Sequence, residues 1–346
     1  MLRVAVIGFG KLGLLHAGLV NSLPGSKLEA VVDNDSRTLS VLKTRMHSVR
    51  CYKDHRKLLD DGDVDAAVIA TPTGFHIDVA VDCVNAGIPI FIEKPLANTA
   101  AQARPLIDAL KRNPVANMCG YMGRYAGTFA KAKEIMESGA LGKLQMLRSS
   151  MYIGQLFARG KGWRYDKTSS GGGVLITQNS HLIDKLIWLF GNVDYVSAQT
   201  RSLYSKEVED YAHVFLSFDN GLAGYLDASW SARHYRTPTI SIHVQGERGT
   251  LDVDDDSTSL FIDKKMNGIA EGRTVWRKPD IFNGVAFDIG GPQYSAQMEA
   301  FIKAASGERS VESDVNSAYN VQLVLEAMYR SAAKNGEPVR PADLTD

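Results

Sequence analysis

The sequence predicts an α/β protein in which an N-terminal Rossmann domain, a doubly wound parallel sheet, precedes a C-terminal α+β domain built on a mostly antiparallel open sheet. Three observations support this. Short apolar runs alternate with longer helical patterns through the first 120 residues, the first run leads into a glycine-rich turn, and closely spaced strand patterns follow Gly120. Alternation of the first kind is typical of parallel strands joined by crossover helices. We therefore expect domains at 1–120 and 121–346.

The first domain is predicted from four apolar runs, each followed by a helical pattern. The runs are continuously apolar, as strands buried on both faces should be. Strands are expected at 2–8, 27–33, 64–70 and 88–93, and helices at 11–22, 36–46, 74–87 and 99–112.

The second domain begins with a helical pattern and continues with strands. Asp219-Asn220-Gly221 is a hairpin turn sequence between two strand patterns, which indicates antiparallel pairing. The elements expected are a helix at 128–139, strands at 144–152, 239–246, 249–254 and 259–263, a hairpin at 213–230, and closing helices at 295–305 and 317–334.

Composition narrows the partner to a small molecule. Lysine plus arginine equals aspartate plus glutamate, at 39 each, so neither nucleic acid nor an anionic membrane surface is expected as a partner. No apolar run approaches the roughly 20 residues of a membrane helix. The three cysteines, Cys51, Cys83 and Cys119, are widely spaced in apolar segments, so we expect no disulfide framework, no metal site and a cytoplasmic location.

A glycine motif between the first strand and the first helix predicts a dinucleotide site. The motif comprises Gly8, Phe9, Gly10, Lys11, Leu12 and Gly13. Asp33 closes the second predicted strand twenty residues later, where it would bind the ribose hydroxyls and favour NAD over NADP. Asn34 and Arg37 follow it and would soften that preference. The alternative is a plain tight turn with a surface aspartate.

Two short polar segments end the next predicted strands. Thr71 and Pro72 follow one strand, and Glu93 and Lys94 follow the other. Ligands in open parallel sheets bind beyond the carboxyl ends of the strands, so we expect all four residues to face the cofactor. His76 either joins them or caps and packs its helix.

The stretch GGGVLITQNSHLID, residues 171–184, places three glycines before an apolar helical pattern that carries a polar strip. At 3.6 residues per turn, Thr177, His181 and either Asp184 or Lys185 share one face. The glycines would let substrate or nicotinamide approach the backbone. The alternative for His181 is a buried, hydrogen-bonded core histidine.

Other residues are weaker candidates for the same pocket. Arg164 would contact the cofactor pyrophosphate or a substrate anion, or else stack on Trp163 at the surface. Tyr294 opens a late helix and would reach the substrate. The histidines of the strand region, His213, His234 and His243, lack metal-ligand spacing and are predicted to be structural.

The glycine loop, TPTGFH (71–76), EKPLA (93–97), Trp163-Arg164 and residues 171–184 occur in one order that resembles the glucose-fructose oxidoreductase and inositol dehydrogenase (Gfo/Idh/MocA) family. The resemblance covers nearly the whole chain. It implies an oxidoreductase with a tightly held nicotinamide cofactor, acting on a sugar, polyol or sugar derivative. It also implies a homodimer or homotetramer assembled through the open sheet.

Within that resemblance, Lys94 falls on the active-site lysine and His181 on the catalytic histidine. Thr177 stands where many members have an aspartate. Residues 120–125 also depart from the family pattern, since Gly123 stands where a second basic residue is common. Tyr121 in that stretch, with Trp163 and Tyr294, is expected to line the substrate side.

These residues permit one mechanism. His181 would act as general acid/base, because imidazole titrates near neutral pH, and Lys94 would stabilise charge on the substrate oxygen. Thr177 would position the substrate. Two alternatives stay open: an NAD-dependent hydrolysis or epimerisation through a transient ketone, and a non-catalytic dinucleotide-binding regulator.

Overall fold

The chain folds into two compact units. The computed structural model describes residues 1–158, 160, 162–266, 268–282 and 284–344, with only the backbone of Trp163 and Ser169. Unit 1 comprises Met1–Met122 and Gly284–Tyr319, and unit 2 comprises Gly123–Asn283 and Asn320–Asp346. The first break lies next to the expected boundary at 120, but the return of 284–319 to unit 1 differs from the two continuous domains that the sequence suggests.

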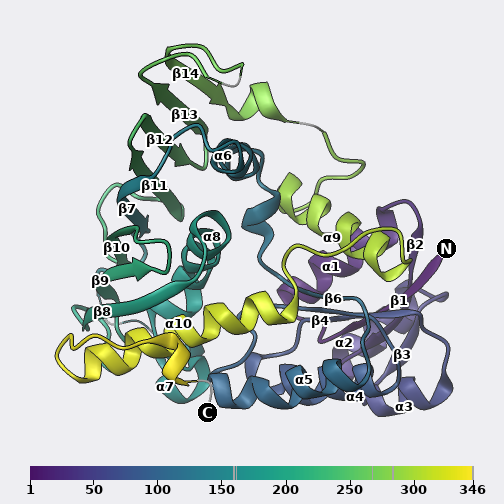
Figure 1. The fold of residues 1–346 in the computed structure, drawn as a ribbon. Coiled ribbons are helices and arrows are strands. Elements are labelled where there is room, and N and C mark those ends of the chain that lie inside the picture. The colour runs from purple at the N-terminus through teal and green to yellow at the C-terminus, as the bar shows by residue number, and fades with distance from the viewer. Residues whose placement is uncertain (159, 161, 267, 283, 345–346) are drawn as a thin grey trace. The chain divides into compact units, whose positions relative to one another are not determined.

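Unit 1 is built on a six-stranded parallel sheet, as predicted (Figure 1). The strand order is β3-β2-β1-β4-β5-β6, the doubly wound arrangement of dinucleotide-binding domains. Two strands, β3 and β6, were not predicted, because each mixes polar with apolar residues and forms no continuous apolar run. The strands are β1 Leu2–Ile7, β2 Ser26–Val32, β3 Arg50–Tyr52, β4 Ala66–Ile69, β5 Ile90–Ile92 and β6 Asn117–Cys119.

The helices of unit 1 lie on both faces of this sheet, with α1 and α9 on one face and α4 and α5 packed together on the other (Figure 1). Side chains at Asp35 and Thr99 cap α2 and α5 by accepting from backbone N–H groups. The helices are α1 Lys11–Ser22, α2 Ser36–Arg45, α3 His55–Asp61, α4 His76–Asn85, α5 Ala100–Arg112 and α9 Pro292–Ala305, with a 3-10 turn, η1, at Thr73–Phe75.

The late segment completes unit 1 at the β6 edge. Phe301 of α9 packs against Phe91 of β5, with ring centroids 5.7 Å apart. The carbonyl of Cys119 accepts hydrogen bonds from Gln297 (3.3 Å) and from the hydroxyl of Ser313 (3.1 Å). These contacts explain why residues far along the chain belong to the first unit.

Unit 2 carries an eight-stranded sheet in the order β14-β13-β12-β11-β7-β10-β9-β8. Among the described strands of this sheet, only β7 and β10 pair in parallel, so the mostly antiparallel prediction is confirmed. The predicted hairpin joins β9 and β10, and Gly221 in its turn has a φ of 85°. The strands are β7 Leu144–Tyr152, β8 Val193–Arg201, β9 Tyr211–Phe218, β10 Ala223–Ser229, β11 Thr239–Gly246, β12 Gly249–Asp254, β13 Ser257–Ile262 and β14 Gly272–Arg277.

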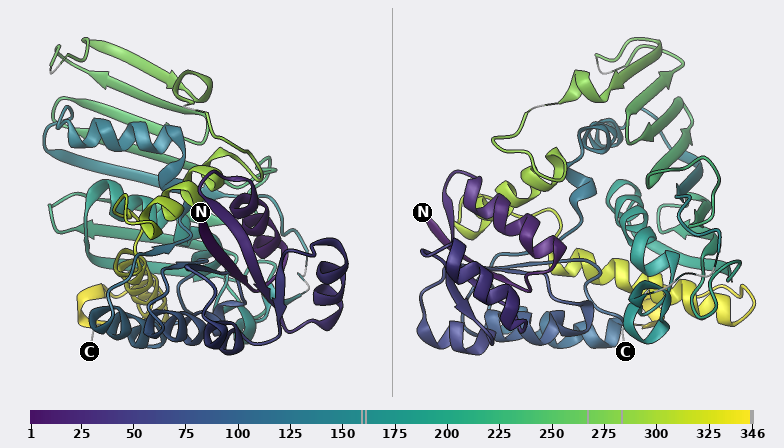
Figure 2. Two further views of the ribbon diagram at one scale, coloured as in Figure 1. Left: turned by 90° about the vertical axis from the view of Figure 1, so that its right-hand side faces the viewer. Right: turned by 180° about the vertical axis from the view of Figure 1, so that it is seen from behind.

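Helices α6 and α8 of unit 2 pack together on one face of this sheet (Figure 2). The opposite face presents alternate side chains to solvent, including Tyr225, which is 49% exposed. The helical segments are α6 Gly127–Glu137, η3 Trp163–Tyr165, α7 Lys167–Ser170, η4 Leu175–Asn179, α8 Ser180–Phe190, η5 Lys278–Ile281 and η6 Pro341–Leu344; η2 Met122–Tyr125 and α10 Val315–Ala333 each cross from one unit to the other.

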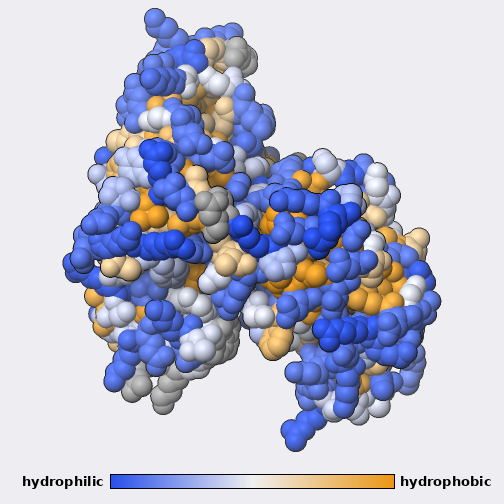
Figure 3. All heavy atoms as spheres, turned by 60° about the horizontal axis from the view of Figure 1, so that its bottom comes forward, coloured by the Kyte–Doolittle hydropathy of each residue, from blue (hydrophilic) through white to orange (hydrophobic). Residues whose placement is uncertain are grey.

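Polar residues cover most of the molecular face in Figure 3, and hydrophobic residues show through in separate patches. Among the described residues, no helix combines the length and the apolar character needed to span a membrane.

Candidate functional site

The glycine loop of unit 1 brings backbone segments closer than any other residue would allow. Gly8 has a φ of 90°, and a Cβ there would lie 2.6 Å from the backbone nitrogen of Thr71. A Cβ on Gly13 would overlap the carbonyl oxygen of Gly8. Gly10 begins α1 without a side-chain cap and has open space beside it. The first-turn N–H groups of α1 therefore form a cradle that suits a pyrophosphate.

Asp33 lies against this loop. One carboxylate oxygen accepts the Phe9 N–H at 2.7 Å, and the other accepts the Asp35 N–H at 2.8 Å. Each oxygen has a second lone pair with which to accept a ribose hydroxyl. Asn34 and Arg37 are exposed at the start of α2. The cradle and the carboxylate beside it fit the adenosine half of NAD.

His76 packs between the ends of two strands. Its ring is buried, with Nε2 2.8 Å from the Thr71 carbonyl oxygen and Nδ1 3.0 Å from that of Pro95. Burial lowers the pKa of the imidazole. These contacts favour the packing alternative for His76. Within the described chain, the hydroxyl of Thr71 has no hydrogen-bond partner, and it lies beside Gly8.

Glu93 is held inside the domain by His16, a residue that sequence reasoning missed. Its Oε1 lies 2.7 Å from His16 Nε2, and both side chains are less than 10% exposed. Burial by itself would raise the pKa of Glu93, but the hydrogen bond and charge of His16 and the charge of Lys94 hold it below its usual value. The sequence did offer one signal for His16, because it lies one turn after Gly13 on the face of α1 that is buried.

Lys94, Tyr121 and Tyr294 belong to unit 1 as well. The Lys94 N–H donates to Glu93 at 3.1 Å, and the Lys94-Pro95 peptide bond is cis. Burial and the Glu93 carboxylate raise the pKa of Tyr294 in α9. Tyr121 is buried after β6. Thr71, Glu93 and Lys94 follow β4 and β5, so these predicted residues lie at the carboxyl ends of two neighbouring strands.

The triple glycine of unit 2 serves close packing. Gly171 has a φ of 76°. A Cβ on Gly172 would overlap the hydroxyl of Tyr329, and one on Gly173 would overlap the carbonyl oxygen of Glu209. The space beside Gly172 and Gly173, expected to admit substrate or nicotinamide, is filled by the protein itself.

Glu209 anchors the segment that follows these glycines. Its carboxylate accepts the N–H groups of Gly173 (2.9 Å) and Leu175 (3.0 Å) and the hydroxyl of Tyr329 (2.8 Å). Burial raises the pKa of Glu209, although the three donors oppose that shift. The carboxylate therefore fixes the start of the helical region that carries Thr177 and His181.

A π-helical turn, Leu175–Asn179, precedes α8 and differs from the regular helix that the sequence predicts. The Thr177 hydroxyl donates to the Gly173 carbonyl at 2.7 Å. Such turns are rare in proteins, but those that occur are often found at functional sites. The turn widens the helix between Thr177 and His181. His181 and Lys185 both lie within α8, one turn apart.

Asp184 pairs with Arg124, a partner that the sequence did not suggest. Arg124 Nε lies 3.1 Å from each carboxylate oxygen, and both side chains are buried. Burial raises the pKa of Asp184 against the attraction of Arg124. Asp184, which the sequence places on the polar face with His181, is thus engaged with a guanidinium.

Lys185 occupies the space that Gly123 leaves open. A Cβ at position 123 would overlap the Lys185 ammonium and would lie 2.7 Å from its Cε. The ammonium also lies 4.5 Å from the centre of the Phe129 ring. Burial lowers the pKa of Lys185 to about 8. The structure therefore places an ammonium beside the backbone position where the sequence lacks a basic residue.

The remaining candidates are less informative. Arg164 is exposed in η3, and the side chain of Trp163 lies outside what the structure describes. His213 and His243 pair with Asp227 and Asp252 on neighbouring strands. Over the described ranges, no group of three or more histidine, cysteine or acidic side chains is arranged to hold a metal ion.

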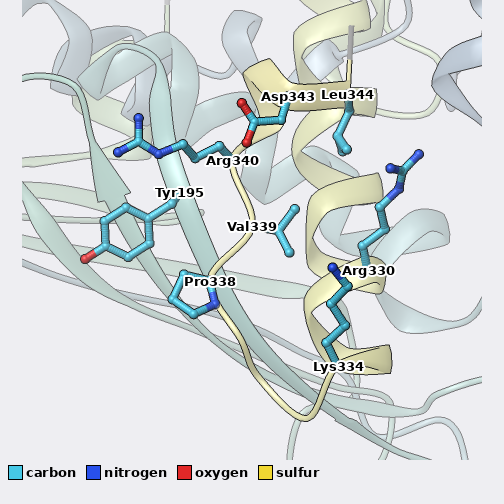
Figure 4. A pocket seen from close by; sticks show the side chains of 8 residues that line it. All are labelled: Tyr195, Arg330, Lys334, Pro338, Val339, Arg340, Asp343 and Leu344. Atoms are coloured by element: carbon cyan, nitrogen blue, oxygen red, sulfur yellow. The ribbon is translucent and has the colours of Figure 1, made fainter. Parts of the chain in front are cut away.

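A cavity of about 600 Å³ lies at the far end of α10 in unit 2 (Figure 4). Tyr195 of β8 and side chains between Arg330 and Leu344 line it. It contains none of the predicted site residues, so it does not alter their assignment.

Comparison with known proteins agrees with these features. Residues 2–121 match the oxidoreductase family with an NAD-binding Rossmann fold, and residues 129–252 match the GFO/IDH/MocA C-terminal domain. The chain is 31% identical to scyllo-inositol 2-dehydrogenase (NAD(+)) of Bacillus subtilis, across 98% of this chain and 96% of that protein. It is 26% identical to levoglucosan dehydrogenase of Pseudarthrobacter phenanthrenivorans, with 96% of each covered.

Solved structures share the fold. Levoglucosan dehydrogenase in complex with NADH and levoglucosan superimposes with a TM-score of 0.85 at 23% identity, covering 100% of both chains. The match to both domain models and the relative that spans nearly the whole chain lead to one conclusion. The protein belongs to the Gfo/Idh/MocA family and is an oxidoreductase with an NAD-binding Rossmann domain.

Proposed function

We propose that the protein transfers a hydride between NAD(H) and a hydroxyl-bearing carbon, or the matching ketone, of a sugar, polyol or sugar derivative. The observation that carries the proposal is the 31% identity, over 98% of the chain, to a dehydrogenase named for scyllo-inositol and NAD(+). The similarity to levoglucosan dehydrogenase supports the same substrate class.

Each unit contributes residues with a defined role. In unit 1, the α1 N-terminus and Asp33 bind the cofactor, whose nicotinamide supplies the hydride acceptor or donor. Lys94 donates to the reacting oxygen and stabilises negative charge on it. His181 of unit 2 takes the hydroxyl proton during oxidation and returns it during reduction.

Thr177 positions the substrate in this proposal. Because its hydroxyl donates to the Gly173 carbonyl, the same oxygen can act only as an acceptor toward a further group. A carboxylate also accepts only, so Thr177 keeps the hydrogen-bonding sense of an aspartate without its charge. Arg164, Trp163, Tyr121 and Tyr294 complete the proposed contacts to cofactor and substrate.

The proposal includes location and assembly. A cytoplasmic location is supported by three free cysteines. A homodimer or homotetramer is supported by the open face of the unit 2 sheet, where Tyr195, Phe215 and Tyr225 form a row of ring contacts 5.7 to 6.0 Å apart. Partly exposed aromatic rows of this kind suit protein interfaces.

The test is NADH formation at 340 nm with a panel of polyols and sugars, in wild type and His181→Ala. We expect the variant to lose about 10² to 10⁴-fold in kcat, as removal of a general acid/base does, with unchanged NAD(H) affinity. His55→Ala is the matched control, because His55 pairs with Asp82 and neither is a predicted site residue. Unchanged turnover in His181→Ala would remove the histidine from the mechanism.

Thr177 favours one second candidate, an NAD-dependent reaction without net redox change. The absent carboxylate allows a different substrate, in which a transient ketone activates hydrolysis or epimerisation. In that case, product would form without accumulation of NADH in the same assay.

A further inference from the structure

Lys185 is a buried cation that the proposed mechanism leaves without a role. It follows His181 by one turn of α8, so the two side chains lie on neighbouring positions of one helix face. His181 is 9% exposed and Lys185 is 3% exposed. A change at Lys185 therefore acts close to the proposed acid/base.

The protein itself does not satisfy the Lys185 ammonium. Among the described residues, it makes no hydrogen bond and has no carboxylate oxygen within 4.0 Å. The carboxylate of Asp184 is engaged by Arg124, and Asp255 accepts the backbone N–H of Ile240 at 3.0 Å. An ammonium has three N–H donors, and none of these has an acceptor within the described part of the protein.

The surroundings of the ammonium are shaped to keep it in place. Gly123 provides the room, since any side chain there would overlap the lysine. The Phe129 ring, 4.5 Å away, attracts the cation through its π face but accepts no conventional hydrogen bond. The site thus holds a positive charge and lacks an acceptor of opposite charge.

We propose that Lys185 determines substrate specificity by binding an anionic oxygen group, a carboxylate or a phosphate, of the sugar substrate near His181. The inference rests on the proposed function, because it places the substrate at His181. An anion supplies the missing acceptor together with an opposite charge, whereas a neutral hydroxyl supplies the acceptor alone. The preferred substrates are therefore sugar acids or sugar phosphates instead of neutral polyols.

Protonation of the lysine adds a pH signature. Burial lowers the pKa of Lys185 to about 8, with Asp255 and Asp184 favouring the charged form and Arg124 opposing it. The ammonium is charged at pH 7 and loses its proton as the pH rises through 8. Affinity for the anion should fall over that interval, while affinity for a neutral polyol should not.

The experiment measures binding to the NADH complex by calorimetry with three matched probes: D-glucitol, D-gluconate and D-glucitol 6-phosphate. The two anions separate the carboxylate from the phosphate. We expect wild type to bind one anion at least about tenfold more tightly than glucitol. In Lys185→Met that ratio should fall to about one, with NADH affinity unchanged. Lys133→Met is the control, because Lys133 already donates to the Trp188 carbonyl at 2.8 Å.

Equal affinities for anions and glucitol in wild type, no anion binding, or an unchanged ratio in Lys185→Met would overturn the inference. Failure of the proposed function looks different. Lys185-dependent binding of an anion without any hydride transfer would support the anion site and reject the dehydrogenase. Rapid oxidation of glucitol by wild type and Lys185→Met alike would support the dehydrogenase and reject the anion site.

Discussion

Two buried basic side chains, His16 in unit 1 and Lys185 in unit 2, differ in whether a carboxylate pairs with them. His16 is 1% exposed and meets the Glu93 carboxylate at 2.7 Å. Lys185 is 3% exposed and has no ion pair within the described chain. Both must leave water, which costs free energy unless a partner compensates. We expect the first side chain to serve the fold, and under the proposal above the second binds a ligand.

The largest effect on stability is expected when the pair of His16 and Glu93 is broken. His16→Leu leaves Glu93 buried with its strongest partner removed and should lower the free energy of unfolding by about 3 to 5 kcal/mol. Urea denaturation at pH 7 measures this. The double variant His16→Leu/Glu93→Leu should recover part of the loss, because no carboxylate then remains buried.

The same pair predicts an acid dependence. The pKa of Glu93 is lower in the folded protein than in the unfolded chain, so its stabilisation is present above the unfolded pKa and is lost as pH falls through the folded one. His16→Leu should lose this part of the acid sensitivity. An effect of His16→Leu below about 1 kcal/mol would show that Glu93 is satisfied by other groups.

The next effect has the opposite sign. Lys185→Met should raise the free energy of unfolding at pH 7 by about 3 kcal/mol, because a pKa lowered from 10.5 to about 8 corresponds to that difference. Between these two pKa values the unfolded chain binds more protons than the folded protein does, so the wild type becomes more stable as the pH rises. The difference in the free energy of unfolding between the wild type and Lys185→Met therefore becomes smaller. Thermal and urea unfolding from pH 7 to 10 measure it, and a destabilised variant would contradict it.

The smallest effect on stability is expected at Glu209, a buried carboxylate whose hydrogen-bond donors are all neutral. Glu209→Gln keeps one oxygen acceptor but introduces an amide that cannot accept, so one donor loses its partner. We expect a loss of about 1 to 2 kcal/mol in the free energy of unfolding. Because Glu209 anchors the π turn, kcat should fall as well, while NAD(H) affinity stays constant. A stable variant with unchanged kcat would separate Glu209 from the positioning of His181.

Local patterns in the sequence predicted much of this molecule. The order of strands and helices in unit 1 follows from the alternation of apolar runs, and the hairpin turn at Gly221 follows from its Asp-Asn-Gly sequence. Gly8, Gly13 and Asp33 were found because their spacing reflects contacts within one βαβ segment. In each case, the interacting residues lie close enough in the chain for one short pattern to contain them.

The contacts that complete the candidate site join distant positions. His16 and Glu93 are 77 residues apart, and Arg124 and Asp184 are 60 residues apart. No periodicity connects such residues, because the tertiary fold alone brings them together. The π turn was also missed, since a five-residue widening leaves the apolar pattern of the helix nearly unchanged.

The return of residues 284–319 to unit 1 has a consequence for biosynthesis. During translation, the nucleotide-binding half emerges first, but the ring of Phe301 and the groups that bond the Cys119 carbonyl emerge only after the other half has left the ribosome. Until then, the edge of the nascent sheet at β6 lacks its final covering. The order of synthesis and the order of structural completion are therefore reversed, and a ribosome stalled before codon 284 would hold an unfinished coenzyme domain.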